Sequence, residues 1–349
     1  MQRYFFFGVV LLIAVLFFSC KRKDKSFIKQ VDKEIDIKGL NLDIRIFRFD
    51  SFFTDLSITN FQGRINDAEK KAPEMYMLFV ESITEAGRIN NPGFYMPRLK
   101  EFLLNTYTLE LYKDVTKNYP DMKVYEKQLN DAFSRVKYYY PKDTIPQFYT
   151  MVSNFAYGIV TYKNLIAISL DHYLGKDYKY YPDLYPKYMI RFFEPDYIIA
   201  DIVKTYFTQK YPEEAYSGKS MISQMVYHGK MLLFLDMILP EVPDSIKICY
   251  SQLQIDWAKE NEGEFWNHLV NQQLLFESNN EKIDRYFNEG PFTNAYGVPA
   301  ECPPRIGQWT GWQILRNYVQ NNKDATFISV LSEKDAQKIL NLSKYKPKI

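Results

Sequence analysis

The side chains that could carry out chemistry are few in this 349-residue chain, which has only three histidines and three cysteines. His228 lies in the stretch VYHGKMLLF. A zinc protease helix would read H-E-x-x-H, with two histidines on one face and a glutamate as base. Here Gly229 takes the place of the glutamate, and Leu232 takes the place of the second histidine. The sequence therefore predicts no working metal site of this type, and it indicates no catalytic residue, metal ligand or cofactor.

The histidines stand in settings that favour packing over catalysis. His172 directly follows Asp171, and neighbouring side chains of an extended segment point to opposite faces, so the two do not form an acid–base pair by themselves. His268 lies beside the apolar residues of a predicted helix, and we assign it no role. His228 is expected to be buried and hydrogen-bonded. The alternative is that His228 and the downstream Glu262 are remnants of a lost hydrolase site.

Cys20 stands where an apolar run ends and a basic cluster begins, in the stretch VLFFSCKRKDK. The uncharged run from Tyr4 to Phe18 follows Arg3 and is shorter than the roughly 20 residues that a membrane-spanning helix needs. A short run of this kind is typical of a secretory signal. The Ser-Cys break predicts a lipoprotein signal, with cleavage before Cys20 and a lipid on its thiol. The alternative is a marginal anchor helix with an incidental cysteine.

The other two cysteines are Cys249 and Cys302. Export would place both in a compartment that permits disulfides. One bridge between them is therefore an expectation, although a bridge also requires the two residues to meet in space. The chain has neither a CxxC redox pair nor the cysteine spacing of a structural zinc site.

The composition is that of a folded protein with a large core, since 46% of the residues are hydrophobic and 25% are charged. A formal net charge of +2 argues against nucleic acid as a partner, because nucleic-acid-binding proteins usually carry a basic surplus. Three segments are predicted: a lipoprotein signal peptide over 1–19, a charged tether over 20–40 and a single globular domain over 41–349.

Strand patterns occur early and in the middle of the chain, and helical patterns dominate the rest. Alternating polarity predicts a strand over 42–50, and β-branched and aromatic residues predict two strands over 148–171, turning at 162–164. Predicted helices cover 73–85, 98–108, 125–139, 196–209, 220–238, 244–260, 262–276, 312–321 and 333–342. Gly229 inside helix 220–238 costs about 1 kcal/mol relative to alanine, so a close neighbour is expected there. The order of elements favours an α+β fold, helix-dominated, with a small mid-chain sheet.

Two segments rich in Tyr or Trp, Gly and charge are candidate recognition loops: DHYLGKDYKYYPDLYP, and the part PPRIGQWTGWQ of a predicted loop over 290–313. The alternative is that each is a rigid loop that plugs the fold. The candidate recognition residues are Asp171, His172, Tyr180, Arg305, Trp309 and Trp312.

Several of these segments together resemble the gliding-motility lipoprotein GldB family of the Bacteroidetes. The resemblance rests on the lipoprotein start and on RIFRFD, ISLDHYLGKDYKYYP, MVYHGKMLLFLDMILP, WAKENEGEFW and GPFTNAYGVPAECPPRIGQWTGWQILRNYV, between about residues 43 and 319. It implies a membrane-anchored protein associated with gliding and type IX secretion, and no known reaction. A fainter likeness to a zincin-like metalloprotease layout implies a degenerate protease scaffold, in which only His228 stands in register.

The leading hypothesis is a non-enzymatic lipoprotein, anchored to a membrane by its N-terminal lipid, that binds partner proteins of the cell envelope through the two candidate loops. One alternative is a divergent metallohydrolase, and a further one is a glycan- or peptide-binding lipoprotein. Lys21, Arg22 and Lys23 follow the lipid site without an acidic neighbour, which favours a periplasm-facing protein and leaves inner and outer membrane as alternatives.

Overall fold

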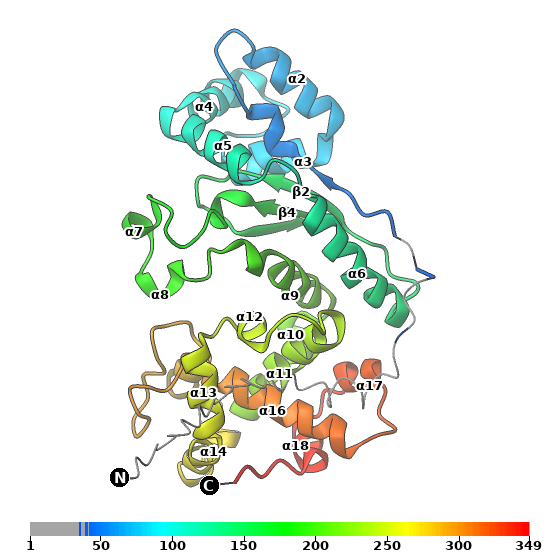
Figure 1. Ribbon diagram of the computed structural model, residues 1–349, viewed down its shortest axis with the longest axis vertical. Helices are drawn as coiled ribbons and strands as arrows, with labels where there is room; N and C mark the ends of the chain where they lie inside the picture. Colours follow the sequence, from blue (N-terminus) through cyan, green and yellow to red (C-terminus); the bar gives the residue numbers. More distant parts are fainter. Residues whose placement is uncertain (1–34, 36–38, 41, 349) are drawn as a thin grey trace, which may run out of the picture.

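A four-stranded sheet lies between two groups of helices in an elongated molecule (Figure 1). The computed structural model describes residues 35, 39–40 and 42–348, so Cys20 and most of the predicted tether lie outside the described residues. Within that range the chain is 59% helical with one small mixed sheet, which confirms the predicted α+β class. No helix of the described part combines the length and apolar character that crossing a membrane requires.

The sheet has the order β1-β2-β4-β3, with β1 and β2 parallel, β2 and β4 parallel, and β3 antiparallel to β4. Its strands are β1 (Ile46–Phe47), β2 (Gln147–Met151), β3 (Ile159–Tyr162) and β4 (Leu165–Ser169). The predicted turn at 162–164 joins β3 to β4, but the mid-chain segment forms three strands where two were expected. Strand β4 is central and entirely buried, as expected for the apolar sequence LIAIS.

The predicted first strand over 42–50 is mostly wrong, because only Ile46 and Phe47 pair with β2. After them the chain turns into a short helix, η1 (Phe49–Phe53). Arg48 holds Asp50 there, with its Nε 2.9 Å from Oδ1 and its Nη2 2.7 Å from Oδ2. Asp50 is fully buried, and a buried carboxylate without a partner is costly. Pairing Asp50 with Arg48 therefore stabilises the fold more than extending the strand would.

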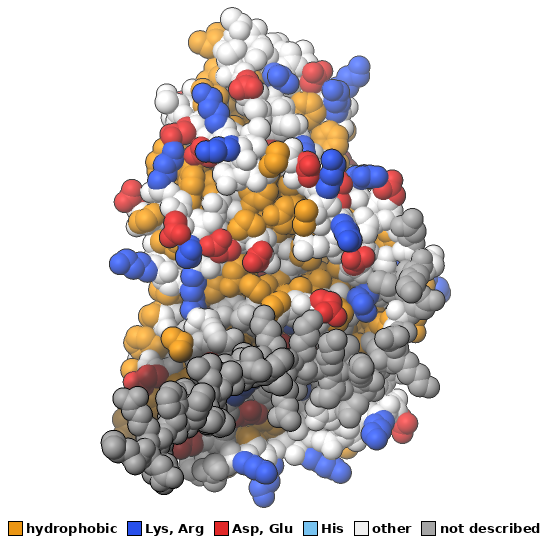
Figure 2. Space-filling view, in the orientation of Figure 1, with side chains coloured by type: hydrophobic (Ala, Val, Ile, Leu, Met, Phe, Trp, Pro, Cys, Tyr) orange, Lys and Arg blue, Asp and Glu red, His pale blue; other side chains and the backbone are white. Residues whose placement is uncertain are grey.

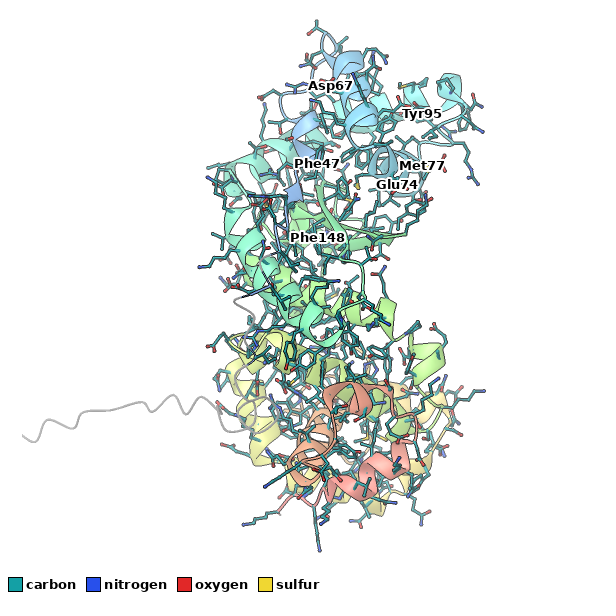
Figure 3. The ribbon with its side chains drawn as sticks, turned by 90° about the vertical axis from the view of Figure 1, so that its right-hand side faces the viewer. Phe47, Asp67, Glu74, Met77, Tyr95 and Phe148 are labelled. Atoms are coloured by element: carbon teal, nitrogen blue, oxygen red, sulfur yellow. The ribbon has the colours of Figure 1, made fainter. Side chains whose placement is uncertain are left out.

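One group of helices covers the sheet on the N-terminal side. Figure 3 shows Phe47 and Phe148 where β1 meets β2, with Asp67 and Met77 on the helices next to them. This group contains α2 (Phe61–Lys71), α3 (Pro73–Leu78), η2 (Phe79–Ile83), α4 (Pro92–Leu104) and α5 (Thr106–Asn118). The helix predicted over 98–108 is in fact parts of α4 and α5, because the chain breaks at Asn105, which caps α5 through Tyr107.

The other side of the sheet leads into the C-terminal helices. Here lie α6 (Lys123–Tyr139), η3 (Leu170–His172), α7 (Tyr181–Leu184), α8 (Lys187–Ile190), η4 (Pro195–Tyr197), α9 (Ile198–Lys210) and α10 (Glu213–Tyr216). The end of the molecule is built by α11 (Met221–Ile238), α12 (Asp244–Ile248), α13 (Gln252–Glu260), α14 (Glu262–Asn271), η5 (Leu274–Phe276), α15 (Asn280–Ile283), η6 (Asp284–Tyr286), α16 (Ile306–Asn321), α17 (Phe327–Ser332) and α18 (Ala336–Ser343).

Apolar and charged side chains are mixed over the face shown in Figure 2. Apolar side chains gather in its middle, over the sheet and α9, and both signs of charge are interspersed around them. Beneath the surface, a continuous core of buried apolar side chains extends from Ile44 to Tyr345. The core therefore joins the sheet to the C-terminal helices.

The backbones of α11 and α16 touch where these two helices cross. A Cβ atom added to Gly311 would lie 1.7 Å from the carbonyl oxygen of Met225, and one added to Gly229 would lie 2.4 Å from that of Gly311. Such distances are far below van der Waals contact, so only glycine fits at either position. The close neighbour expected at Gly229 is therefore the backbone of α16.

We expect Gly311→Ala to lower the free energy of unfolding by about 3 kcal/mol or more, because the added methyl group must force the two helices apart. Urea unfolding would measure the loss. Gly63→Ala is the matched control, since Gly63 is in the exposed face of α2 with nothing within 4 Å of the added Cβ. This control should gain up to about 1 kcal/mol. Equal effects of the two substitutions would contradict the backbone contact.

Candidate functional site

The first candidate loop folds back onto the protein through its own polar groups. Asp171 is fully buried, and its carboxylate accepts hydrogen bonds from Phe155 N at 2.7 Å and from Ser169 Oγ at 2.5 Å. His172 Nε2 lies 3.1 Å from the hydroxyl of Tyr185, and burial lowers the pKa of this histidine. Asp171 and His172 therefore hold the loop in place, as the plugging alternative expects.

Tyr180 of the same loop lies closer to the surface. Its hydroxyl donates to Glu110 Oε2 at 2.5 Å, and its ring packs against Tyr107 with centroids 4.4 Å apart. The half-buried ring is thus tied to α5, and the more exposed part of the loop is charged, with Lys176, Asp177 and Lys179.

The predicted loop over 290–313 is wrong in its last third, because α16 already begins at Ile306. Trp309 and Trp312 are 1% and 0% exposed, so neither indole reaches the surface. Their spacing with Ile306 places apolar side chains on the buried face of a helix. Gly307 and Gly311 suggested a loop, but in the structure they let α16 pack closely against its neighbours.

Trp312 belongs to a buried network of charges around Asp236. The indole Nε1 donates to Asp236 at 2.8 Å, Arg316 contacts the same carboxylate through Nε and Nη2 at 2.9 Å each, and Lys247 adds a third contact at 2.9 Å. Burial alone would raise the pKa of Asp236, but the two cations outweigh it and lower that pKa. Every charge in this network has a partner, which is what a structural network requires.

The two residues proposed as remnants of a hydrolase site have separate surroundings. His228 stacks on Phe287 with ring centroids 5.5 Å apart, and burial together with Arg305 lowers its pKa to about 4. Its buried Nδ1 has no hydrogen-bond partner among the described residues, so the hydrogen bond expected for a buried histidine is not formed at that atom. Glu262 accepts a hydrogen bond from Tyr345 at 2.7 Å, and burial raises its pKa. Within the described residues, no three His, Cys, Asp or Glu side chains are arranged to hold a metal ion.

The expected disulfide between Cys249 and Cys302 is absent from the structure, where both are buried free thiols. Each thiol has its own neighbours. Cys249 Sγ lies 3.2 Å from the ammonium of Lys204, while Cys302 contacts the backbone of Pro303. Burial raises the pKa of Cys302 to about 12, so this thiol is unreactive at neutral pH.

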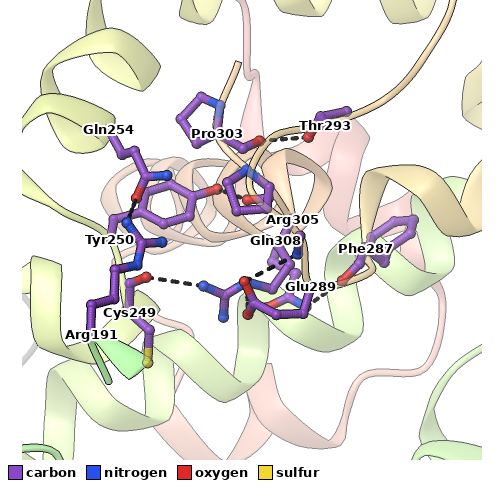
Figure 4. A network of polar contacts seen from close by, with 12 residues as sticks. Arg191, Cys249, Tyr250, Gln254, Phe287, Glu289, Thr293, Pro303, Arg305 and Gln308 are labelled. Atoms are coloured by element: carbon purple, nitrogen blue, oxygen red, sulfur yellow. Dashed lines mark hydrogen bonds and ion pairs between the residues drawn. The ribbon is translucent and has the colours of Figure 1, made fainter. Parts of the chain in front are cut away.

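Arg305 joins a network of polar contacts that the sequence did not reveal (Figure 4). Its Nη2 donates to the carbonyl of Cys249 at 3.0 Å, and its Nε lies 2.9 Å from Glu289. Arg191 approaches from the other side and donates through Nη1 to Gln254 Oε1 at 2.8 Å. We call Arg191, Gln254, Glu289 and Arg305 the arginine cluster.

The arginine cluster holds two guanidinium groups and one carboxylate. Both guanidinium carbons lie near the ring of Phe192, at 4.5 Å for Arg191 and 5.8 Å for Arg305. Gln254 is also the third helical residue of the capping box that Ser251 begins at α13. The S-x-x-Q pattern from Ser251 to Gln254 is the one sequence motif within the arginine cluster. It predicts the start of a helix and does not predict a binding site.

The segment over 290–304, which we call the aromatic loop, presents two large side chains to solvent. Tyr296 is 89% exposed and Phe292 is 42% exposed. The base of the loop is fixed, because Thr293 N donates to Cys302 O at 2.9 Å and its hydroxyl donates to Pro303 O at 2.5 Å. The exposed aromatic groups of this segment are therefore Phe292 and Tyr296, and the two tryptophans of α16 are part of the core.

Comparison with known proteins identifies one family. The model of the family described as gliding motility protein GldB matches residues 30–347, nearly the whole chain. No curated protein and no solved structure matches significantly.

His228 gives the fold a specific dependence on pH. Its folded pKa of about 4 lies below the unfolded value of 6.5, so the unfolded state binds the proton more tightly and stability falls as pH drops from 6.5 to 4. Between pH 7.5 and pH 5 we expect this residue to account for a loss of about 2 kcal/mol. Urea unfolding of wild type and His228→Phe at both pH values would measure it.

The difference between wild type and His228→Phe measures the contribution of His228 alone, because all other titrating groups are the same in both proteins. His228→Phe should keep the stacking on Phe287 and show a shallower loss on acidification. Parallel pH profiles of the two proteins would contradict a buried, neutral His228.

Proposed function

This chain belongs to the gliding motility protein GldB family, and we propose that it is a lipid-anchored envelope protein that binds partner proteins without catalysing a reaction. The proposal places it on the periplasmic side of a membrane. Its lipid anchor would be Cys20, and the basic residues from Lys21 to Lys25 would lie near anionic headgroups at roughly 1 kcal/mol each. The family match begins at residue 30, beyond this anchor segment.

The observation that carries the binding role is the aromatic loop. Tyr296 is 89% exposed at a tight turn, where Val298 N donates to Ala295 O at 3.2 Å and Gly297 has a φ of +74°. Exposing a large aromatic ring offers no benefit to folding, and aromatic side chains are common energetic centres of interfaces. The loop therefore has the composition of a contact surface.

The loop is also held in one conformation before any partner arrives. Thr293 ties its two ends together, and the hydroxyl of Tyr250 donates to the carbonyl of Pro304. The ring of His268 on α14 lies close to Gly297, since a Cβ atom added there would be 3.4 Å from it. A preformed loop loses little conformational entropy on binding, so more of the contact energy appears as affinity.

The anchor is tested by Cys20→Ala expressed in the native host. We expect the unprocessed precursor to accumulate and labelling with radioactive palmitate to be lost, because both lipidation and signal cleavage depend on this thiol. Gel mobility and palmitate incorporation would be measured. Cys249→Ala is the control and should be processed normally. A mature product of unchanged size from Cys20→Ala would rule out the lipid anchor.

The binding role is tested by replacing Phe292 and Tyr296 together with alanine. If these rings are central to an interface, their removal costs 2 kcal/mol or more, which weakens binding by roughly 30-fold. The lipidated protein would be extracted from native membranes in mild detergent, and its co-purifying envelope proteins would be quantified by mass spectrometry. We expect one or more specific partners to be lost and the melting temperature to stay unchanged.

Val124→Ala is the matched control, because Val124 is 66% exposed at the start of α6, far along the chain from the aromatic loop. This variant should retain every partner. Equal recovery of partners by the wild type and the double variant would contradict a contact through the aromatic loop.

A further inference from the structure

Two arginines of the described residues, Arg48 and Arg316, bind a buried carboxylate through one edge of the guanidinium group. The Nε and Nη2 atoms lie on this edge with their N–H bonds parallel, and they match the two oxygens of a carboxylate. Arg48 binds Asp50 in this way, and Arg316 binds Asp236 in this way, with Nε and Nη2 each 2.9 Å or less from a carboxylate oxygen. Both acids are buried.

Arg191 presents the same edge without an acceptor. Its Nε and Nη2 atoms are both buried and have no hydrogen-bond partner among the described residues. Buried donors are rarely left unpaired, because each one that loses water without gaining a partner costs about 1–3 kcal/mol. Two adjacent donors in this state, in the geometry that binds a carboxylate, indicate a missing acceptor with two oxygens.

The charge balance points to an acceptor that is negative. No carboxylate of the described residues lies within 4.0 Å of a nitrogen of Arg191, and Glu289 is already paired with Arg305 at 2.9 Å. The nearby Lys204 is balanced by Asp201 at 3.1 Å. The arginine cluster therefore carries one uncompensated positive charge, and burial lowers the pKa of Arg191 accordingly.

The guanidinium of Arg191 is also held in a fixed orientation. Gln254 accepts from Nη1 at 2.8 Å, on the side opposite the unpaired edge, and Phe192 packs against the guanidinium carbon at 4.5 Å. Gln254 is itself fixed, because its side chain also accepts from Ser251 N at 3.0 Å at the start of α13. These contacts orient the unpaired Nε–Nη2 edge without pairing with it, as a preorganised site requires.

We propose that the arginine cluster is a binding site for an oxyanion, a carboxylate or a phosphate-type group, which binds bidentately to Nε and Nη2 of Arg191. Arg305 contributes a second positive charge to the same site, and Gln254 acts as a positioning residue. Glu289 and Arg305 directly flank the aromatic loop, but its exposed rings, Phe292 and Tyr296, take no part in the oxyanion site. Anion binding is therefore tested independently of the proposed partner binding.

The full-length lipidated protein in detergent would be melted at pH 7.5 in increasing sodium acetate and, separately, sodium phosphate, with ionic strength held constant by sodium chloride. We expect the melting temperature to rise with the logarithm of one plus the ratio of anion concentration to Kd, by roughly 2 °C at ten times the Kd. Acetate and phosphate distinguish the two sources, because the anion that raises the melting temperature at constant ionic strength identifies the group. The absence of a shift with either anion would mean that water alone fills the site, and would overturn the proposal.

Two substitutions test whether the rise in melting temperature depends on the Nε and Nη2 donors of Arg191. Arg191→Gln should abolish the shift, while Arg88→Gln, at a residue whose side chain is 82% exposed, should leave it unchanged. If Arg191→Gln does not fold, Arg191→Lys provides the test, because it keeps the charge and loses the paired donors. The lysine variant should bind at least tenfold more weakly in isothermal titration calorimetry. Wild-type affinity in either Arg191 variant would overturn the proposal.

Discussion

The contact between the backbones of α11 and α16 is the constraint on which the C-terminal part of this protein depends. Gly229 and Gly311 let the helices approach until only glycine fits between them. At that separation the residues next to the two glycines are placed with little freedom. Trp312 meets Asp236 on one side of the crossing, and His228 packs against Phe287 on the other. Closeness of the two helices thus sets both the charged network and the histidine environment.

Buried charged side chains occur in two arrangements in this fold, one with ionic partners and one without. Around Asp236, two cations and one further acid, Asp244, complete a balanced set in which each group has a partner. Around Arg191, one guanidinium is oriented by neutral neighbours and has no acid of its own. The first arrangement fixes how the helices align, because any other alignment would leave a buried charge without its partner. The second leaves electrostatic attraction available for something that is not part of the folded chain.

Much of the fold can be predicted from local pattern, and the failures have physical causes. Helix 220–238 is predictable because it is apolar all round, and the turn between β3 and β4 follows from its residues. The start of α16 could not be predicted, because Gly307 and Gly311 look like loop residues until their close neighbours are known. The sequence singled out Arg305 as a candidate recognition residue of a loop, and the structure places it in a polar network that the loop pattern did not indicate. Arg191 had no local signal. Its hydrogen-bond partner Gln254 lies 63 positions further along the chain and meets it only after folding.

The distance along the chain between Gly229 and Gly311 has a consequence for the order of folding. Helix α11 buries almost its whole surface, yet the helix that covers its glycine face is near the end of the chain. In a chain exported N-terminus first, α6 and α9 can pack on α11 at once, but its glycine face stays uncovered until α16 has followed. During that interval this face is open to aggregation, so we infer that biogenesis favours rapid completion of the chain or protection by a chaperone.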